Sequence, residues 1–248
     1  MTLPPLVTIL TTAQHKLDKG RARKWATCGI TLAPGNSAKL GTVCASAGVC
    51  EAINCIADSG RNRFAKSKSA RYRRTLLFKR HTAQFFAQAS AELTLWHIEQ
   101  SAQGFKVACR PNILSDLPAM AHQLARQHPS IQMYDYTKHP RPADRRLANY
   151  HLTYSYSEKT TPADLDHCIE NRVNVAVVFG LKRSDKLPKT FTLHGREFPV
   201  IDGDVSDLRF LDPCDRSYIV GLRWKVGKDS ARKLAKAMRA GYVAQVAA

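Results

Sequence analysis

Hydrophobic and polar positions follow two different periods along this chain. Short apolar runs typical of β-strands recur from residue 26 to residue 224, and segments with helical spacing separate most of them. The expected strands are residues 26–33, 105–111, 131–137, 150–157, 174–180 and 217–224, with a hairpin at 190–202 around His194 and Gly195. The run at 174–180, NVAVVFG, is apolar almost throughout, which is typical of a strand buried on both faces of a sheet.

The helical segments complete this pattern. Apolar residues at three- and four-residue steps predict one long helix at about 66–103, which Gly104 would end. Shorter helices are expected at 117–129, 162–171 and 229–240. Strands that alternate with helices favour parallel βαβ units. We therefore expect a single α/β domain over residues 1–248, a partial or irregular (β/α) barrel with a mostly parallel sheet.

Net charge changes this picture most. The 248-residue chain has 38 Lys and Arg against 20 Asp and Glu, which gives +18. A folded domain this basic usually meets a polyanion, because each phosphate contact releases counterions. We expect nucleic acid as the partner, DNA more than RNA; a merely basic protein is the alternative.

The sequence also indicates a location. No apolar run approaches the roughly 20 residues that a membrane span needs. The first residues lack the basic start and the cleavage site of a signal peptide. A cytoplasmic protein without a membrane partner is therefore expected.

Basic residues concentrate at and after a cysteine-containing loop at 41–63. No Asp or Glu occurs between Asp58 and Glu92. The long helix expected there would therefore present a phosphate-binding face. The candidate nucleic-acid-binding residues are Arg61, Arg63, Arg71, Arg73, Arg74, Lys79 and Arg80.

Three of the seven cysteines lie close together in that loop. Cys44, Cys50 and Cys55 have the spacing C-x5-C-x4-C among Gly, Ala and Ser residues. Thiolates on such a loop can converge on an iron–sulfur cluster, or on zinc if a fourth ligand joins them. The loop follows the first expected strand, as the cluster loop of radical-SAM enzymes does, although their C-x3-C-x2-C spacing is absent. Three unligated small residues are the alternative.

Polar residues gather where the expected strands end, which is where parallel α/β folds collect their chemistry. The stretch VIDGDVSDLRFLD at 200–212 places four aspartates within eleven residues. Carboxylates this close shift one another's pKa values, which suits acid–base or nucleophilic work or a hard cation; turn formation is the alternative. The candidate catalytic residues are Asp135, Lys138, His151, Asp202 and Asp204, and the candidate substrate-binding residues are Asn112, Asp116, Asn149, Asp207 and Arg209.

Several stretches together resemble a known family. They are AGVCEAINCIADSGRNR, IQMYDYTK, NYHLTYSYSE, NVAVVF and VIDGDVSDLRFLDP followed by IVGL. In combination they are similar to the bacteriophage family called gene product 88, over about residues 25–222. The resemblance implies a phage origin, hence a host-cell cytoplasm, and a single domain. It implies no established chemistry.

Three functions fit these features. The first is an enzyme that modifies nucleic acid, by base modification or base exchange, with a flipped base at a polar barrel mouth. The second is a non-catalytic DNA- or RNA-binding protein with a structural metal at the cysteines. The third is a metal-dependent nuclease whose aspartates hold magnesium.

Overall fold

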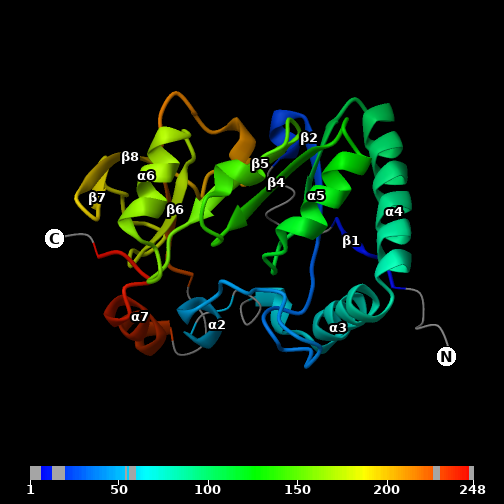
Figure 1. The fold of residues 1–248 in the computed structure, drawn as a ribbon, viewed down its shortest axis with the longest axis horizontal. Helices are drawn as coiled ribbons and strands as arrows, with labels where there is room; N and C mark the ends of the chain where they lie inside the picture. The colour runs from blue at the N-terminus through cyan, green and yellow to red at the C-terminus, as the bar shows by residue number, and fades with distance from the viewer. Residues whose placement is uncertain (1–6, 13–19, 54, 56–59, 226–229, 246–248) are drawn as a thin grey trace. The chain divides into compact units, whose positions relative to one another are not determined.

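The computed structural model describes residues 7–12, 20–53, 55, 60–225 and 230–245 (Figure 1). The chain divides into two compact units that are interleaved in sequence. The first unit comprises Met1–Ala45, Arg61–Asp135 and Leu147–His151. The second comprises Ser46–Gly60, Tyr136–Arg146 and Leu152–Ala248. The loop at 41–63 therefore contributes residues to both.

The predicted α/β class is confirmed. Nine strands are described, most of them pair in parallel, and their order is that of an open sheet rather than a closed barrel. All the predicted strands are present, within a few residues of the expected bounds. The two-residue strand β1 (Leu10–Thr11) and the short helix α2 (Val49–Ile53) were not predicted.

In the first unit the strands run in the order β1, β2 (Trp25–Ile30), β3 (Lys106–Arg110) and β4 (Gln132–Thr137), of which residues up to Asp135 belong to this unit. β1 is antiparallel to β2, whereas β2, β3 and β4 are parallel. Cys28 and Cys109 face each other in the β2–β3 register, and both are fully buried. They are small core residues, as ordinary buried cysteines often are.

Two helices stand where one was predicted. α3 (Ala65–Arg80) ends at His81, and α4 (Thr82–Ala102) begins there in a new direction (Figure 1). His81 leaves the helical conformation with φ −137° and ψ 55°. The bend lets Phe78 on α3 pack edge-to-face against Phe85 and Phe86 on α4, with ring centroids 5.1 and 6.4 Å apart. Aromatic packing thus compensates for the interrupted helix.

The rest of the first unit supports this arrangement. Helix α5 (Pro118–Gln127) has proline in its first turn and buries Met120 and Leu124. Phe85, Ala89 and Leu93 form the buried face of α4. These side chains recur at four-residue steps, so the predicted apolar face is present on α4, whereas α3 buries Arg71, Thr75 and Leu77.

The second unit contains β5 (Tyr150–Ser155) from Leu152 onward, followed by β6 (Val175–Phe179), β9 (Ile219–Arg223), β8 (Arg196–Asp202) and β7 (Thr190–Leu193), in that order. The β7–β8 hairpin turns at His194 and Gly195, which both have positive φ, as a tight hairpin requires. Helix α6 (Pro162–Glu170) begins with a capping box between Thr161 and Asp164.

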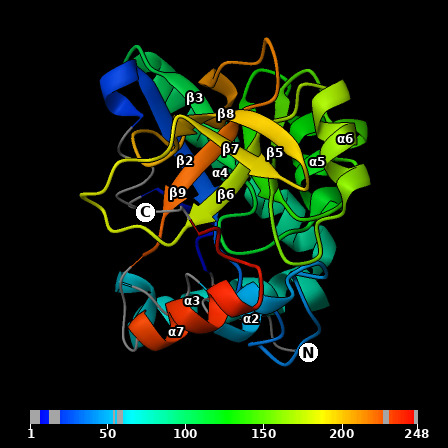
Figure 2. The ribbon, with the colours of Figure 1, turned by 90° about the vertical axis from the view of Figure 1, so that its left-hand side faces the viewer.

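Helix α7 (Ser230–Arg239) contacts α2 in this unit (Figure 2). A small core of Ile53, Trp224, Ala237 and Val243 joins them. The larger core of the unit lies around β6, which is buried on nearly all positions, as the uninterrupted apolar run predicted.

Candidate nucleic-acid interface and buried carboxylate

Asp135 is the most buried of the predicted catalytic residues. It lies on β4 with 1% of its surface exposed. Its Oδ1 accepts a hydrogen bond from the backbone N–H of Asn112 (2.8 Å), and its Oδ2 accepts from Asn112 Nδ2 (2.9 Å) and from the Tyr150 hydroxyl (3.1 Å). Three donors therefore converge on one carboxyl group.

Burial dominates the ionisation of this carboxyl group. It raises the pKa of Asp135 from 3.8 to about 7, although the charge of Arg110 and the hydrogen bonds from Asn112 and Tyr150 act in the opposite direction. Burial also raises the pKa of Tyr150 well above 10, and the neighbouring Asp135 adds to that shift. A carboxyl group with a pKa near 7 exchanges its proton at neutral pH, which general acid–base chemistry requires.

Asn112 connects this carboxyl group to the β3–α5 loop. Besides donating to Asp135, its Oδ1 accepts from the Ser115 hydroxyl (2.8 Å) and from the backbone N–H of Leu117 (3.0 Å). Both ends of the amide are thus engaged within the protein, so Asn112 shapes the loop that precedes α5. The strand beside it needs Gly29, because a Cβ there would lie 2.6 Å from the carbonyl oxygen of Arg110.

The predicted residue Asp116 follows in the same loop. Its backbone N–H donates to the carbonyl of Val43 (2.8 Å), and it forms a parallel bridge with Cys44. The Cys44 thiol donates to the carbonyl of Leu114 (3.5 Å) and accepts from the N–H of Gly35 (3.4 Å). Cys44 therefore holds two loops together.

The other two loop cysteines belong to the second unit. The Cys50 thiol donates to the carbonyl of Ala47 (3.6 Å), and both Cys50 and Cys55 are half-buried. Nearby, Glu158 accepts a hydrogen bond from the N–H of Val49 (2.8 Å). Among the residues that the model describes, no three His, Cys, Asp or Glu side chains are placed to hold a metal ion. The geometry gives no support to the predicted metal centre at Cys44, Cys50 and Cys55.

Asp202 and Asp204 are paired with cations in the second unit. The guanidinium of Arg223 lies 2.9 Å from Asp202 Oδ2 and 3.2 Å from Asp204 Oδ2, and Lys225 binds the other oxygen of Asp204. Burial opposes ionisation of Asp204, but the hydrogen bonds from Lys225 and Arg223 outweigh it and lower its pKa. Both carboxylates thus take part in an ion-pair network at the ends of β8 and β9.

The predicted pair Asp207 and Arg209 is also internal. Arg209 is 1% exposed, forms an ion pair with Asp212 (3.3 Å) and donates to the carbonyl of Ser206. The carbonyl of Asp207 accepts from the N–H of Arg209 (2.9 Å). These contacts close a short turn, which matches the turn interpretation of this acidic stretch.

The remaining predicted site residues are divided between the units. Asp135, Asn149 and His151 belong to the first, whereas Lys138, Asp202 and Asp204 belong to the second. The Asn149 amide nitrogen lies within hydrogen-bonding distance of three carbonyls, of Ala125, His128 and Ile131 (2.9–3.1 Å). Lys138 and His151 are half-buried. A common site for these residues stays a prediction.

The basic segment divides into structural and exposed side chains. Arg71 is buried and donates to the carbonyl of Asn62 (2.9 Å), and Arg74 donates to the carbonyl of Thr8 and to the Thr31 hydroxyl (both 2.6 Å). Burial lowers the pKa of Arg74, with Glu92 acting against it. Lys79 binds the carbonyl of Thr42 (3.0 Å). These three cations of the predicted phosphate-binding face stabilise the fold of the first unit.

The exposed part lies around the first two turns of α3. Phe64, Lys68 and Tyr72 are spaced by four residues, so they share one face of the helix. Phe64 is 60% exposed and Tyr72 45% exposed. Arg63 and Lys66 are exposed in the same stretch of chain, although Lys66, two residues from Lys68, lies on the other side of the helix. We call these five residues the α3 surface.

Sequence reasoning assigned the α3 surface only in part. Arg63 was predicted to bind nucleic acid, but Phe64, Lys66, Lys68 and Tyr72 were not among the candidate residues. The recurrence of Phe64, Lys68 and Tyr72 was the available signal, because an aromatic–cation–aromatic stripe cannot be the buried face of a helix. Arg73 is half-buried and Arg80 is exposed. The side chain of Arg61 lies outside the described residues.

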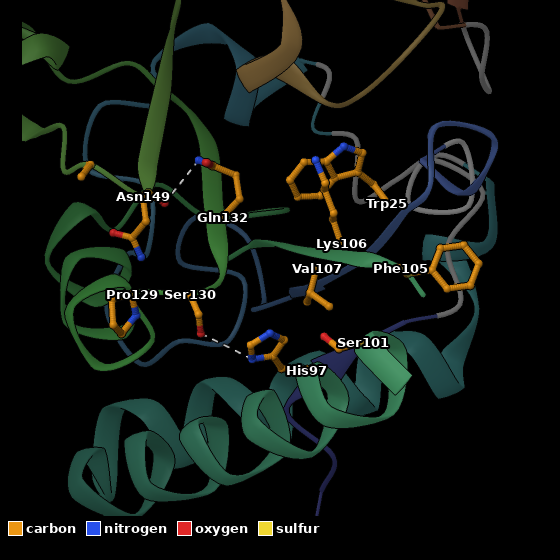
Figure 3. A pocket seen from close by; sticks show the side chains of 11 residues that line it. Trp25, His97, Ser101, Phe105, Lys106, Val107, Pro129, Ser130, Gln132 and Asn149 are labelled. Atoms are coloured by element: carbon orange, nitrogen blue, oxygen red, sulfur yellow. Dashed lines mark hydrogen bonds between the residues drawn. The ribbon is translucent and has the colours of Figure 1, made fainter. Parts of the chain in front are cut away.

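A separate pocket of about 530 Å³ lies at the amino ends of β2, β3 and β4 (Figure 3). Trp25, Phe105 and Lys106 form one side, and the Lys106 amine lies 5.7 Å from the centre of the Trp25 ring. On the other side His97 points toward Ser130, 3.5 Å away. The pocket is therefore at the opposite ends of these strands from the loop that contains Asn112.

Taken together, these features define an α/β protein with an open, mostly parallel sheet and an exposed basic and aromatic helix surface. The model of the family described as Gene product 88 matches residues 8–239. The chain belongs to that phage family, as its motifs indicated. No curated protein and no solved structure matches the chain. None of the described helices is long and apolar enough to cross a membrane.

Proposed function

We propose that this phage protein binds nucleic acid through the α3 surface, in the cytoplasm of the host cell, and that unpaired bases are its target. The observation that carries the proposal is the exposed stripe of Phe64, Lys68 and Tyr72. Exposed aromatic rings stack on bases of any sequence, while Lys and Arg between them neutralise phosphates. The stretch between Asp58 and Glu92 contains no acidic residue that would repel the backbone.

Unpaired strands fit this surface better than a duplex does. A phenyl or phenol ring that stacks on a base needs the base's flat face, which a duplex hides. The two rings lie about two helical turns apart, one at the N-cap and one on α3, and the lysine between them lets the surface offer alternating contacts to bases and phosphates. The +18 net charge adds a general attraction for any polyanion.

The test uses labelled single-stranded and duplex DNA and RNA of equal length. Fluorescence anisotropy measures the binding constant K of each over a range of salt concentrations. Stacking contributes about 1–3 kcal/mol per base, so Phe64→Ala with Tyr72→Ala should weaken single-strand binding at least about tenfold. Replacing Lys66 and Lys68 by Ala should flatten the slope of log K against log salt by about 1.4, at roughly 0.7 per phosphate contact.

The matched control removes two exposed lysines of the second unit, Lys186 and Lys189. It changes the net charge equally but leaves the α3 surface intact. If the control weakens binding as much as the Lys66 and Lys68 changes do, binding depends on total charge alone. The proposal fails in that case, and also if the aromatic variants bind single strands as the wild type does.

Enzymatic modification of bases is the second candidate, and Asp135 favours it. A carboxyl group with a pKa of about 7, here within the parallel strand β4, can transfer protons at physiological pH. The aspartates at 202 and 204 are less suited, because Arg223 and Lys225 already occupy them as ion-pair partners. The same ion pairs weaken the nuclease hypothesis, since a magnesium ion would have to displace these cations.

This second candidate has its own readout. Nucleoside mass spectrometry would compare DNA from phage that carry wild-type, Asp135→Asn and Asp135→Glu genes. Loss of a modified nucleoside with Asn, at unchanged protein level and single-strand binding, supports catalysis. A nucleoside composition that is identical in all three phages would leave only the binding function.

A further inference from the structure

Helix α4 presents a largely apolar face to solvent over its whole length, with the exposed Glu99 at its edge. Leu95 is 61% exposed and Ile98 62% exposed. The other residues on this side, Ala83, Ala87, Ala91, Thr94 and Ala102, are all exposed as well. Their spacing of three and four residues puts them on one side of the helix, which we call the α4 stripe. The opposite side is buried through Phe85, Ala89 and Leu93.

The composition of this helix is unusual for a protein with +18 net charge. Thr82–Ala102 contains no Lys or Arg. Its two acids are Glu92 and Glu99, and Glu92 is bound to the N–H groups of Ile9 (3.0 Å) and Leu10 (2.8 Å), on the side away from the stripe. Thr94 donates its hydroxyl proton to the carbonyl of Ser90 (3.0 Å), which satisfies the donor within the helix.

We infer that the α4 stripe is a self-association surface, at which a second copy of this chain packs its own α4 in an antiparallel direction. Contiguous exposed apolar surface of this kind marks an interaction site in soluble proteins. Two copies that each carry +18 repel one another, and the repulsion is weaker across a face whose own residues carry no positive charge. α4 is the longest of the described helices that contain no Lys or Arg.

Residue sizes along the stripe favour the antiparallel direction. The small residues Ala83, Ala87 and Ala91 occupy the first half, and the large Leu95 and Ile98 occupy the second half. A two-fold axis across the middle of the helix would place Ile98 of each copy opposite Ala87 of the other. Large side chains then fill the space over small ones at both ends, as a self-complementary interface of two identical helices requires.

The expected interface is modest. A helix of this length extends about 30 Å, and one helix pair covers less than the roughly 1,600 Å² of a standard interface. The dimer should therefore dissociate in the micromolar range or above. Self-association of this kind does not depend on nucleic-acid binding, so the two proposals can fail separately.

The first test is analytical ultracentrifugation of the full chain, free of nucleic acid, from micromolar to tenths-of-millimolar concentrations. The wild type should shift from monomer to dimer, and Leu95→Lys with Ile98→Lys should stay monomeric at every concentration. The control changes two exposed apolar residues of the second unit, Ile169→Lys with Val205→Lys, which are 41% and 65% exposed. It adds the same charge and should leave dimerisation unchanged.

The second test separates specific pairing from general hydrophobic adhesion. Ala87→Leu adds apolar surface but should weaken the dimer at least tenfold, because the added side chain meets Ile98 of the second copy. Combining Ala87→Leu with Ile98→Ala exchanges the small and the large side chain of this contact. The double variant should dimerise as strongly as the wild type. A wild type that is monomeric throughout, or a dimer that Ala87→Leu strengthens, overturns the antiparallel α4 pairing. Binding of a different protein by the stripe would then be the remaining explanation.

Discussion

Replacing Asp135 by Asn should change how the stability of the protein depends on pH. The carboxyl group accepts three hydrogen bonds while almost fully buried. An Asn side chain can keep the bond from the backbone of Asn112 and can donate to the Tyr150 hydroxyl, which is free to rotate. Its amide nitrogen then faces the amide nitrogen of Asn112, which cannot turn because Ser115 and Leu117 hold its other end. That conflict costs about 1–3 kcal/mol at a pH where the wild-type acid is neutral.

The sign of the pH dependence follows from the pKa values. The pKa of Asp135 is 3.8 without its surroundings and about 7 in the folded protein. Folding therefore favours the protonated form, so the stabilisation is complete below pH 3.8 and is lost as the pH rises through 7. At about 1.36 kcal/mol per pH unit, the free energy of unfolding of the wild type falls by about 2–3 kcal/mol between about pH 5 and pH 7. The Asn variant has no such loss, so the two stabilities converge at alkaline pH.

Urea unfolding at a series of pH values measures this difference. Histidine titrations occur in both proteins and cancel when one curve is subtracted from the other. Asp166→Asn is the control: its hydrogen bond to Arg196 lowers the pKa of Asp166, so its effect should be constant over the same range. If the difference in stability between the wild type and the Asp135→Asn variant stays flat from about pH 5 to pH 8, the assignment of a raised pKa to this residue is refuted.

Two further changes test the packing and the ion pairs. Gly29→Ala should destabilise the protein by about 1–3 kcal/mol in urea unfolding, because its Cβ would lie 2.6 Å from the carbonyl oxygen of Arg110, which belongs to a strand and cannot move freely. Arg223→Ala should cost a similar amount at neutral pH, since it removes the guanidinium contact to Asp204 while the backbone N–H bond remains. Because the pKa of Asp204 is lowered in the folded protein, this cost should shrink as the pH falls below about 4, and a cost that persists there would count against the ion pair.

The apolar pattern was sufficient to predict the strands and most helices. Runs such as residues 174–180 form strands that are buried on both faces of the sheet, and an almost uninterrupted apolar run fits no other type of element. The bend at His81 had no local signal, since neither Gly nor Pro occurs there. It depends on the packing of Phe78 against Phe85, which only the folded chain reveals.

The functional residues were harder to predict for a similar reason. The aspartate cluster suggested a site, but the partner of Asp202 and Asp204 is Arg223, about twenty residues further along and on the neighbouring strand β9. Likewise, the charge of Arg71 suggested a surface role, whereas the folded chain buries it with a hydrogen bond to Asn62. Local composition identifies charged residues, whereas their pairing is set by contacts between distant segments.

The interleaving of the two units has a consequence for how the protein is made. Residues 46–60 belong with residues 152–248, so they leave the ribosome long before the segment against which they pack. Contacts of such large sequence separation slow folding, because the intervening chain must be ordered before they form. Neither unit is a contiguous piece that truncation or gene exchange could isolate. We expect phage recombination to keep this gene whole, with viable breakpoints only near its ends.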